Sequence, residues 1–180
     1  MAWSPDGIWL VQYNSENLYL INTQTQNICS VDLGDYGEAG QGQMFYAQWS
    51  PDGRYLSMAI KRQRPTPELN ILDIESMELS ILSIPLNTET WPPESIGGST
   101  WSPNSQIILL QAGSYDAEIK KTVANWLLVD IQAHQYTNVL PDYKFLPGIG
   151  NIVWSPDGAK VAYSCSTTED GNICLINLSQ

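Results

Sequence analysis

Short apolar runs alternate along the whole chain with clusters of turn residues, and no segment has the periodicity of an amphipathic helix. Residues 44–96 are the clearest example, where MFYAQW, RYLSMAIK, LNILDI and ELSILSI follow one another with turn residues or loops between them. Short runs rich in β-forming residues and bounded by turn residues predict strands. The one stretch long enough to suggest a helix, Tyr115 to Val129, is predicted as a loop that leads into the strand NWLLVDI. The pattern therefore predicts an all-β fold with four short strands per unit.

A five-residue sequence motif repeats along the chain at long and similar intervals. WSPDG begins at Trp3, Trp49 and Trp154, and the related WSPNS begins at Trp101. The intervals between successive tryptophans are 46, 52 and 53 residues, a period typical of propeller blades and other stacked repeats. A second landmark keeps the same register, because each unit later has an apolar run followed by a polar residue, at Asn22, Asp73, Asp130 and Asn177. The predicted units are approximately residues 1–43, 44–96, 97–148 and 149–180.

Ser-Pro-Asp-Gly predicts a tight turn between the first and second strands of a unit. Pro fixes φ near the value that a type I turn needs, Asp suits the next position, and Ser can cap the turn. Gly takes the left-handed conformation that closes the hairpin. Ser105 replaces this Gly in the third unit, which costs about 1 kcal/mol if the backbone stays left-handed. The sequence therefore leaves open a change of turn type at this position.

The Trp before each turn ends a first strand and offers a large apolar surface at the seam between units. Repeated aromatic residues at a fixed register are normally structural in propellers. We therefore interpret the motif as a folding device and not as four copies of a binding site. Its positions are Trp3, Pro5, Asp6, Gly7, Trp49, Pro51, Asp52, Gly53, Trp101, Pro103, Asn104, Trp154, Pro156, Asp157 and Gly158.

The stretches WSPDGRYLSMAI and LNILDIESMELSILSI resemble the TolB-type repeat, in which W-S-P-D-G joins the first two strands of a β-propeller blade. The resemblance covers nearly all of the chain. It implies blades of four antiparallel strands arranged radially, with about four blades present. It also implies a bacterial protein, and it favours a periplasmic or extracellular location, although no signal peptide precedes the first motif. Proteins with this repeat include periplasmic binders of partner proteins and the propellers of prolyl oligopeptidase-like enzymes.

Both ends of the repeat array are incomplete. Two residues precede the first motif Trp, and the last unit ends after its third strand, NICLINL. Because a propeller closes its ring so that no sheet edge stays exposed, we predict part of a larger ring, or half of a ring completed by a second copy in a homodimer. A closed four-bladed ring is the disfavoured alternative.

The long connections between strands are predicted to share one face of the propeller. Tight first-to-second and third-to-fourth turns occupy the other face. Long loops on a rigid scaffold usually carry the binding residues, and aromatic and Arg side chains anchor protein interfaces. The same loops also hold many carboxylates, so ordinary solvated loop charge is the alternative. The predicted binding face comprises Tyr36, Arg62, Arg64, Trp91, Tyr115, Tyr143 and Phe145.

Composition limits the classes of partner. Eight Lys and Arg against nineteen Asp and Glu give a formal charge of −11, which would repel nucleic acid and anionic membrane surfaces. No apolar run is long enough to predict membrane insertion. With 43% hydrophobic and 15% charged residues, the chain is predicted to fold as a globular protein.

Candidate catalytic and metal-binding residues are few. A nucleophile elbow, G-x-S-x-G, is absent, and GGST at Gly97 lacks the closing Gly. The sole histidine, His134, is predicted as an exposed turn residue. Asp32, Asp35 and Glu38 could bind calcium, but their spacing matches no EF-hand loop, and acidic turn residues are the favoured interpretation. We therefore predict no catalytic residue, no metal and no cofactor.

The three cysteines lack the spacing of a metal site. Cys165 and Cys174 could form a disulfide across the last hairpin, in a register that places Tyr163 opposite Ile176; two buried thiols are the alternative. A disulfide would favour an exported protein. Cys29, in a predicted fourth strand, is expected to be a small core residue.

Three functions remain open. The leading hypothesis is a non-enzymatic scaffold that binds a protein or peptide through the long-loop face. The first alternative is a propeller that controls access to the catalytic domain of a prolyl oligopeptidase-like serine hydrolase. The second is a propeller that binds carbohydrate or another small ligand with Trp91 and the loop tyrosines.

Overall fold

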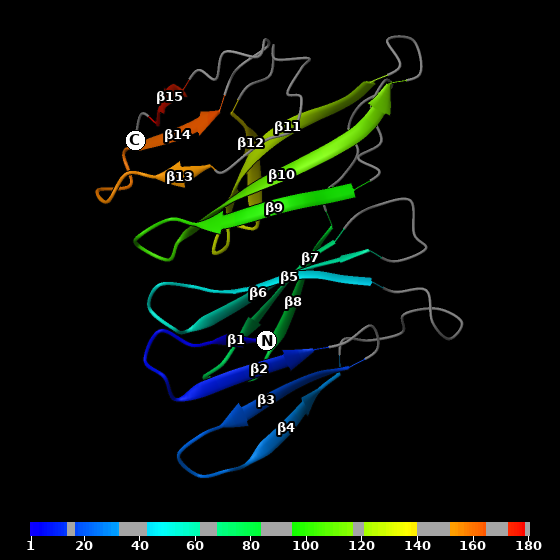
Figure 1. The fold of residues 1–180 in the computed structure, drawn as a ribbon, viewed down its shortest axis with the longest axis vertical. Helices are drawn as coiled ribbons and strands as arrows, with labels where there is room; N and C mark the ends of the chain where they lie inside the picture. Colours follow the sequence, from blue (N-terminus) through cyan, green and yellow to red (C-terminus); the bar gives the residue numbers. More distant parts are fainter. Residues whose placement is uncertain are drawn as a thin grey trace. The chain divides into compact units, whose positions relative to one another are not determined.

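The computed structural model describes eight segments of the chain, and their regular structure is all β-strand (Figure 1). The all-β fold class predicted from the sequence is confirmed, since the strands form antiparallel sheets. The chain divides into two compact units, Met1–Ile96 and Gly97–Gln180. The described segments are residues 1–13, 17–32, 43–61, 68–83, 95–116, 121–139, 152–164 and 173–178.

The first unit contains two four-stranded sheets in which each strand pairs with the next one along the chain. The strands of the first sheet are β1 (Ala2–Trp3), β2 (Trp9–Tyr13), β3 (Leu18–Asn22) and β4 (Ile28–Val31). The strands of the second sheet are β5 (Gln43–Trp49), β6 (Tyr55–Lys61), β7 (Glu68–Asp73) and β8 (Leu79–Ser83). The four strands predicted for residues 44–96 are all present.

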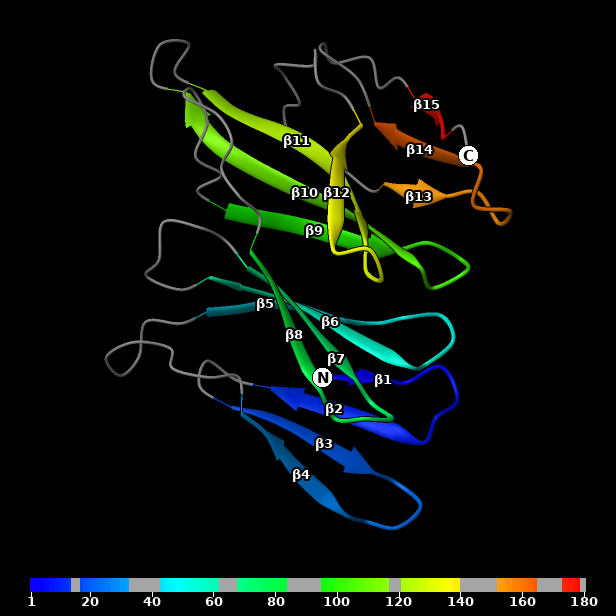
Figure 2. The ribbon, with the colours of Figure 1, turned by 180° about the vertical axis from the view of Figure 1, so that it is seen from behind.

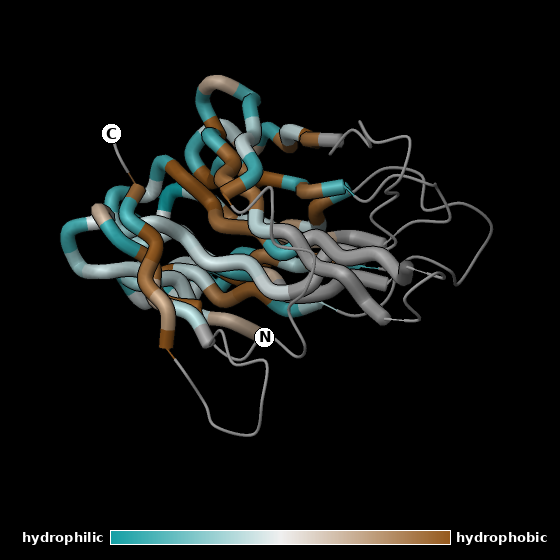
Figure 3. The backbone as a smooth tube through the Cα atoms, turned by 90° about the horizontal axis from the view of Figure 1, so that it is seen from above, coloured by the Kyte–Doolittle hydropathy of each residue, from teal (hydrophilic) through white to brown (hydrophobic). Residues whose placement is uncertain are grey.

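Alternation of side chains along these strands builds the core of the first unit. Val11 on β2 pairs with Leu20 on β3, and Leu56 on β6 pairs with Leu72 on β7; all four side chains are at most 1% exposed. They belong to one apolar cluster to which both sheets contribute. Each such buried side chain contributes about 1.5–3 kcal/mol, so this cluster stabilises the packing of the two sheets. Figure 3 shows apolar residues along the strands and hydrophilic residues in the turns.

The second unit has one four-stranded and one three-stranded sheet within the described residues (Figure 2). The four strands are β9 (Ser95–Trp101), β10 (Ile107–Asp116), β11 (Lys121–Asp130) and β12 (Gln135–Asn138). The three strands are β13 (Val153–Trp154), β14 (Lys160–Ser164) and β15 (Ile173–Asn177). Both sheets contribute to its core, whose buried members are Leu109, Trp126, Val161 and Tyr163.

The strand NWLLVDI is confirmed within β11, but the loop predicted to lead into it from Tyr115 is wrong for the described residues, since Tyr115–Asp116 and Lys121–Ala124 lie in strands. β10 and β11 form a hairpin of two ten-residue strands, in which Tyr115 pairs with Thr122 and Asp116 pairs with Lys121. Charged residues interrupt the apolar alternation near the hairpin tip, which hid both strand ends in the sequence. Backbone pairing that runs from Ile107 with Asp130 to Asp116 with Lys121 carries both strands to this tip. Tyr115, a predicted loop residue, therefore lies in a strand.

Two cysteine predictions are corrected. Cys29, expected in the core, is an exposed free thiol. It continues the buried row of Val11 and Leu20 onto β4, but β4 is the edge strand of its sheet and has a neighbour on one side only. The expected register of the last hairpin is wrong by two residues, since Tyr163 pairs with Cys174. A shift of two keeps each side chain on the same face, so apolar alternation cannot distinguish the registers.

Cys174 itself is disulfide-bonded. Its side chain packs on the core of the second unit together with Ile176, from the inner face of β15. Cys165, the partner expected from the sequence, lies outside the described residues.

Candidate functional site

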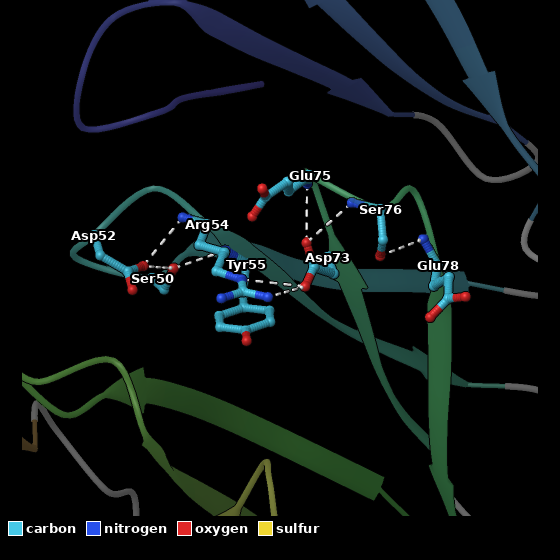
Figure 4. A network of polar contacts seen from close by, with 8 residues as sticks. All are labelled: Ser50, Asp52, Arg54, Tyr55, Asp73, Glu75, Ser76 and Glu78. Atoms are coloured by element: carbon cyan, nitrogen blue, oxygen red, sulfur yellow. Dashed lines mark hydrogen bonds and ion pairs between the residues drawn. The ribbon is translucent and has the colours of Figure 1, made fainter.

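The motif turn is held by a compact set of hydrogen bonds, seen most clearly at Ser50–Gly53 (Figure 4). The Ser50 hydroxyl donates to Asp52 Oδ1 at 2.6 Å and accepts from the backbone N–H of Tyr55 at 2.8 Å. Asp52 Oδ1 also accepts from the backbone N–H of Arg54 at 3.0 Å. The turn closes through the Gly53 N–H, which donates to the carbonyl oxygen of Ser50. Both polar side chains of the motif thus bond the turn itself.

All four copies make the same bonds. The hydroxyls of Ser4, Ser102 and Ser155 donate to the Asp or Asn two residues later and accept from the backbone N–H five residues later. The Ser4 hydroxyl and the Ile8 N–H lower the pKa of Asp6, because both hydrogen bonds favour its charged form. The Ser155 hydroxyl and the Ala159 N–H lower the pKa of Asp157 in the same way.

The third turn keeps its conformation despite the change of residue. The motif glycines have φ values of 71°, 76° and 72°, and Ser105 at the same position has a φ of 60°. The change of turn type that the sequence left open does not occur. Ser105 also donates its N–H to the Ser102 carbonyl oxygen at 2.9 Å, as the glycines do at their own turns. The surrounding hydrogen bonds hold a serine in a region that favours glycine.

The polar residue of the second landmark stabilises the turn between the third and fourth strands of each four-stranded sheet. Asp73 Oδ1 accepts from the backbone N–H groups of Glu75 and Ser76, at 2.9 and 3.3 Å. Asn22 and Asp130 make the same pair of bonds in their turns. Side chains of this kind stabilise turns by replacing a backbone acceptor. The sequence identified the polar positions but gave them no role.

A left-handed residue follows each of these caps by four positions. Gln26, Met77 and His134 have φ values of 62°, 58° and 52°. His134 is exposed in the turn between β11 and β12, where the sequence placed it.

The motif tryptophans connect neighbouring sheets within each unit. Trp49 Nε1 donates to the Ala2 carbonyl oxygen at 3.2 Å, and Trp154 Nε1 donates to the Thr100 carbonyl oxygen at 3.3 Å. In both cases the acceptor precedes the motif Trp of the earlier sheet. The burial of the motif tryptophans differs, however: Trp101 is 7% exposed and Trp3 is 59% exposed.

The motif turns themselves also stack within each unit. A Cβ built at Gly53 would lie 3.6 Å from Pro5 Cδ, and one at Gly158 would lie 3.8 Å from Pro103 Cδ. The glycine of the later turn therefore lies beside the proline of the earlier turn in both units.

The second sheet has a charged cluster that sequence reasoning missed. Arg54 donates to Asp73 Oδ2 through Nε at 3.2 Å and Nη2 at 2.9 Å, and its guanidinium lies 5.1 Å from the Tyr55 ring centre (Figure 4). Partial burial acts to raise the pKa of Asp73. The hydrogen bonds from Arg54 and from the Glu75 and Ser76 N–H groups outweigh this effect, so the pKa is lowered.

A signal for this cluster was present in the sequence. Arg54 directly follows a motif Gly, and Asp73 is the landmark residue of the same unit. Only the second sheet has opposite charges at these two positions; the pairs in the other sheets are Ile8 and Asn22, Gln106 and Asp130, and Ala159 and Asn177.

A buried side-chain amide in the first unit has no hydrogen-bond partner among the described residues. Asn70 on β7 is fully buried, and among the described residues its side-chain oxygen and nitrogen have no hydrogen-bond partner. Asn70 pairs with Met58 on the face that carries Leu72. Burying such a group costs about 1–3 kcal/mol.

Most of the predicted binding face lies outside the described residues. Asp35 and Glu38 of the calcium alternative also lie outside the described residues. In the described part of the chain, no three His, Cys, Asp or Glu side chains lie close enough together to bind a metal ion. The same residues contain no helix that is long and apolar enough to cross a membrane. Of the predicted binding residues only Tyr115 lies within the described segments; those outside are Tyr36, Arg62, Arg64, Trp91, Tyr143 and Phe145.

Solved structures share this arrangement of sheets. TolB from Acinetobacter baumannii matches 97% of this chain with a TM-score of 0.55 and 13% identity, over 39% of its own chain. The chain has a TolB-like β-propeller fold. The predicted propeller class is therefore confirmed, and the four sheets are its blades. The predicted incomplete ring stays a prediction.

Two enzymes match the fold of this chain over part of their own length. Dipeptidyl peptidase 4 from Porphyromonas gingivalis matches 98% of this chain with a TM-score of 0.73 and 10% identity, over 30% of its own chain. An oligogalacturonate lyase in complex with manganese matches 93% with a TM-score of 0.60 and 16% identity, over 42% of its own chain. This chain thus spans less than half the length of each solved chain. No protein-family profile and no curated protein sequence matches it.

Proposed function

We propose that the chain is a non-catalytic propeller scaffold that binds a protein or peptide through the connections opposite the motif turns. The polar side chains of the motif turns and of the third-to-fourth turns support this proposal, because they are engaged in hydrogen bonds within those turns. The motif hydroxyls and the Asn and Asp caps bond backbone N–H groups of their own turns. The partner would then bind the long connections at the opposite ends of the strands. Loops on a rigid scaffold commonly carry binding residues, and these connections contain aromatic and Arg residues.

Selection of peptides from a displayed random library tests the proposal without a known partner. We expect peptides that bind the native chain and lose at least tenfold affinity when Arg62, Arg64, Trp91 and Tyr143 are all replaced by Ala. The matched control is Arg54→Ala, which removes a basic side chain from the turn end and is expected to leave binding unchanged. Equal binding to the loop variant, or loss of binding in the control, would contradict the proposal.

A role beside a hydrolase domain is the second candidate. The likeness to dipeptidyl peptidase 4 supports it, because the structure of that peptidase matches 98% of this chain. The coding sequence on either side of this chain provides the test. A neighbouring G-x-S-x-G between a predicted strand and helix would favour this candidate over the scaffold.

Carbohydrate or small-ligand binding is the third candidate, supported by the likeness to the oligogalacturonate lyase. Trp91 and the loop tyrosines would supply the stacking surfaces. A glycan array is the test, and absence of binding to every glycan would count against it.

We also propose that Cys165 is the partner of Cys174. Cys29 is a free thiol and Cys174 is disulfide-bonded, and the chain has three cysteines. Such a bond favours a periplasmic or extracellular location. Mass spectrometry after alkylation is expected to detect one modified cysteine without reductant and three with it. Three modified cysteines without reductant would contradict the pairing.

A further inference from the structure

The two sheets of each unit pack through the same pair of faces. We call the face that carries the motif Trp the tryptophan face, and the opposite side the reverse face. In the first unit the tryptophan face of β5–β8, with Leu56 and Met58, packs on the reverse face of β1–β4, with Val11 and Leu20. In the second unit the tryptophan face of β13–β15 packs on the reverse face of β9–β12. The repeat therefore defines a two-sided interface.

The tryptophan face of β1–β4 carries apolar side chains that are exposed in the described part of the chain. Trp3, Leu10, Ile21 and Ile28 pair in turn across its four strands, so one apolar row crosses the whole sheet. Trp3 is 59% exposed and Ile28 is 65% exposed. Among the described residues, none accepts a hydrogen bond from the Trp3 indole, although Trp49 and Trp154 both have a carbonyl acceptor.

The reverse face of β13–β15 also carries apolar side chains that are exposed among the described residues. Val153, Ala162 and Leu175 pair across its three strands in the positions that Ala2, Val11 and Leu20 occupy in the first sheet. Val11 and Leu20 are fully buried, whereas Val153 and Leu175 are 55% and 65% exposed. Ile173, further along β15 on the same face, is 81% exposed.

We propose that the tryptophan face of β1–β4 docks on the reverse face of β13–β15 of a second copy of this chain. One chain supplies both halves of an interface that already forms once inside each unit. Exposed apolar rows of this kind mark association surfaces, and unlike halves on one chain generate a head-to-tail assembly. By analogy with Trp49 and Ala2, the Trp3 indole of one copy donates to the Val153 carbonyl oxygen of the other.

The charge of the chain sets the salt dependence of this association. Each copy carries a formal charge of −11, so two copies repel one another at long range. Salt screens this repulsion and leaves apolar contact largely unaffected. Association is therefore expected to strengthen as salt rises from low to physiological concentration.

Light scattering during gel filtration, over a range of protein concentrations, is the first test. The native chain is expected to reach at least twice the 20.1 kDa mass of one copy. Trp3→Glu and Leu175→Glu each place a charge on one half of the interface, and each variant alone is expected to stay at 20.1 kDa. Met77→Glu changes an exposed apolar residue in a turn and is the matched control, with association retained.

Mixing the two interface variants tests the head-to-tail pairing. The Leu175→Glu copy keeps an intact Trp3 face, and the Trp3→Glu copy keeps an intact Leu175 face, so an equimolar mixture is expected to form a dimer with one contact. Circular dichroism of each variant checks that it is folded. A native chain that stays at one-copy mass at every concentration would overturn the proposal. So would a mixture of folded variants that forms no dimer.

Discussion

The turns at Ser50–Gly53 and Ser102–Ser105 share their hydrogen bonds but differ in two residues. Asp52 and Gly53 of the first turn correspond to Asn104 and Ser105 of the second. The serine hydroxyl donates at 2.6 Å in the first and 2.7 Å in the second, and it accepts at 2.8 and 2.9 Å. The geometry of the turn therefore depends on an acceptor at its third position and not on a charge there.

The two turns also differ in the residue that follows each of them. Arg54 follows the first turn and is bonded to Asp73, whereas Gln106 follows the second and contacts Asn104 Nδ2 at 3.3 Å. The strained residue lies in the turn without the ion pair. The serine-centred bonds, common to both turns, are therefore the feature that maintains the left-handed position.

Removal of the turn hydroxyl is expected to have the largest effect. Ser50→Ala and Ser102→Ala each remove the acceptor of a backbone N–H at a buried position, which costs about 1–3 kcal/mol of unfolding free energy. We expect Ser102→Ala to lose more, because the strain at Ser105 then lacks part of its support. Urea denaturation provides the measurement.

The matched control for these variants is Ser80→Ala, at an exposed position on β8. Its free energy of unfolding is expected to change by less than about 0.5 kcal/mol. Losses for Ser50→Ala and Ser102→Ala as small as that of the control would show that the hydroxyl is not needed.

Exchange of the left-handed residues is expected to have the second largest effect, with opposite signs in the two turns. Gly53→Ala should cost about 1–2 kcal/mol, because the new Cβ has room beside Pro5 and the cost arises from the backbone conformation. Ser105→Gly should stabilise the chain by less than about 1 kcal/mol, since relief of strain is partly offset by loss of the buried hydroxyl.

Thermal unfolding compares these two variants with Gly98→Ala. Gly98 lies in β9 without a positive φ, and nothing lies within 4 Å of a Cβ added there. This control is expected to cause no loss of stability. A loss at Gly98 equal to that at Gly53 would contradict the role assigned to the left-handed backbone.

The strands and the motif turns were predictable because their signals are local. Two-residue alternation marks a strand, and Pro, Asp and Gly each constrain a single turn position. The β10–β11 hairpin was missed because Asp116 and Lys121 interrupt the alternation while pairing with one another across the hairpin. The exposure of Cys29 depends on its place at a sheet edge, which the local sequence does not encode.

The candidate site was less accessible to sequence reasoning. The Arg54 and Asp73 pair joins residues nineteen positions apart, so it depends on the pairing of β6 with β7. Of the predicted binding residues, Tyr115 is in a strand and the remainder lie outside the described segments. Long connections lack the apolar alternation that predicts strands and the Pro, Asp and Gly pattern that predicts tight turns, so their conformation could not be predicted.

Removal of the charge from the landmark residue is expected to have the smallest effect, and it tests whether the ion pair adds to the turn. Asp73→Asn keeps an Oδ1 acceptor, like Asn22 in the first sheet, but removes the partner of Arg54. Because the pKa of Asp73 is lowered in the folded chain, its charge stabilises the fold fully above its unfolded pKa of about 3.9. This contribution is lost as the pH falls through the lowered folded value.

The native chain should therefore be slightly more stable than Asp73→Asn at pH 7, and the difference should disappear in acid. Asp130→Asn is the matched control, because Asp130 caps the equivalent turn opposite Gln106 instead of an arginine. Urea denaturation of both variants at a series of pH values measures the difference. An equal loss in the two variants would assign the effect to the turn cap alone, and a difference that persists in acid would exclude the Asp73 charge as its origin.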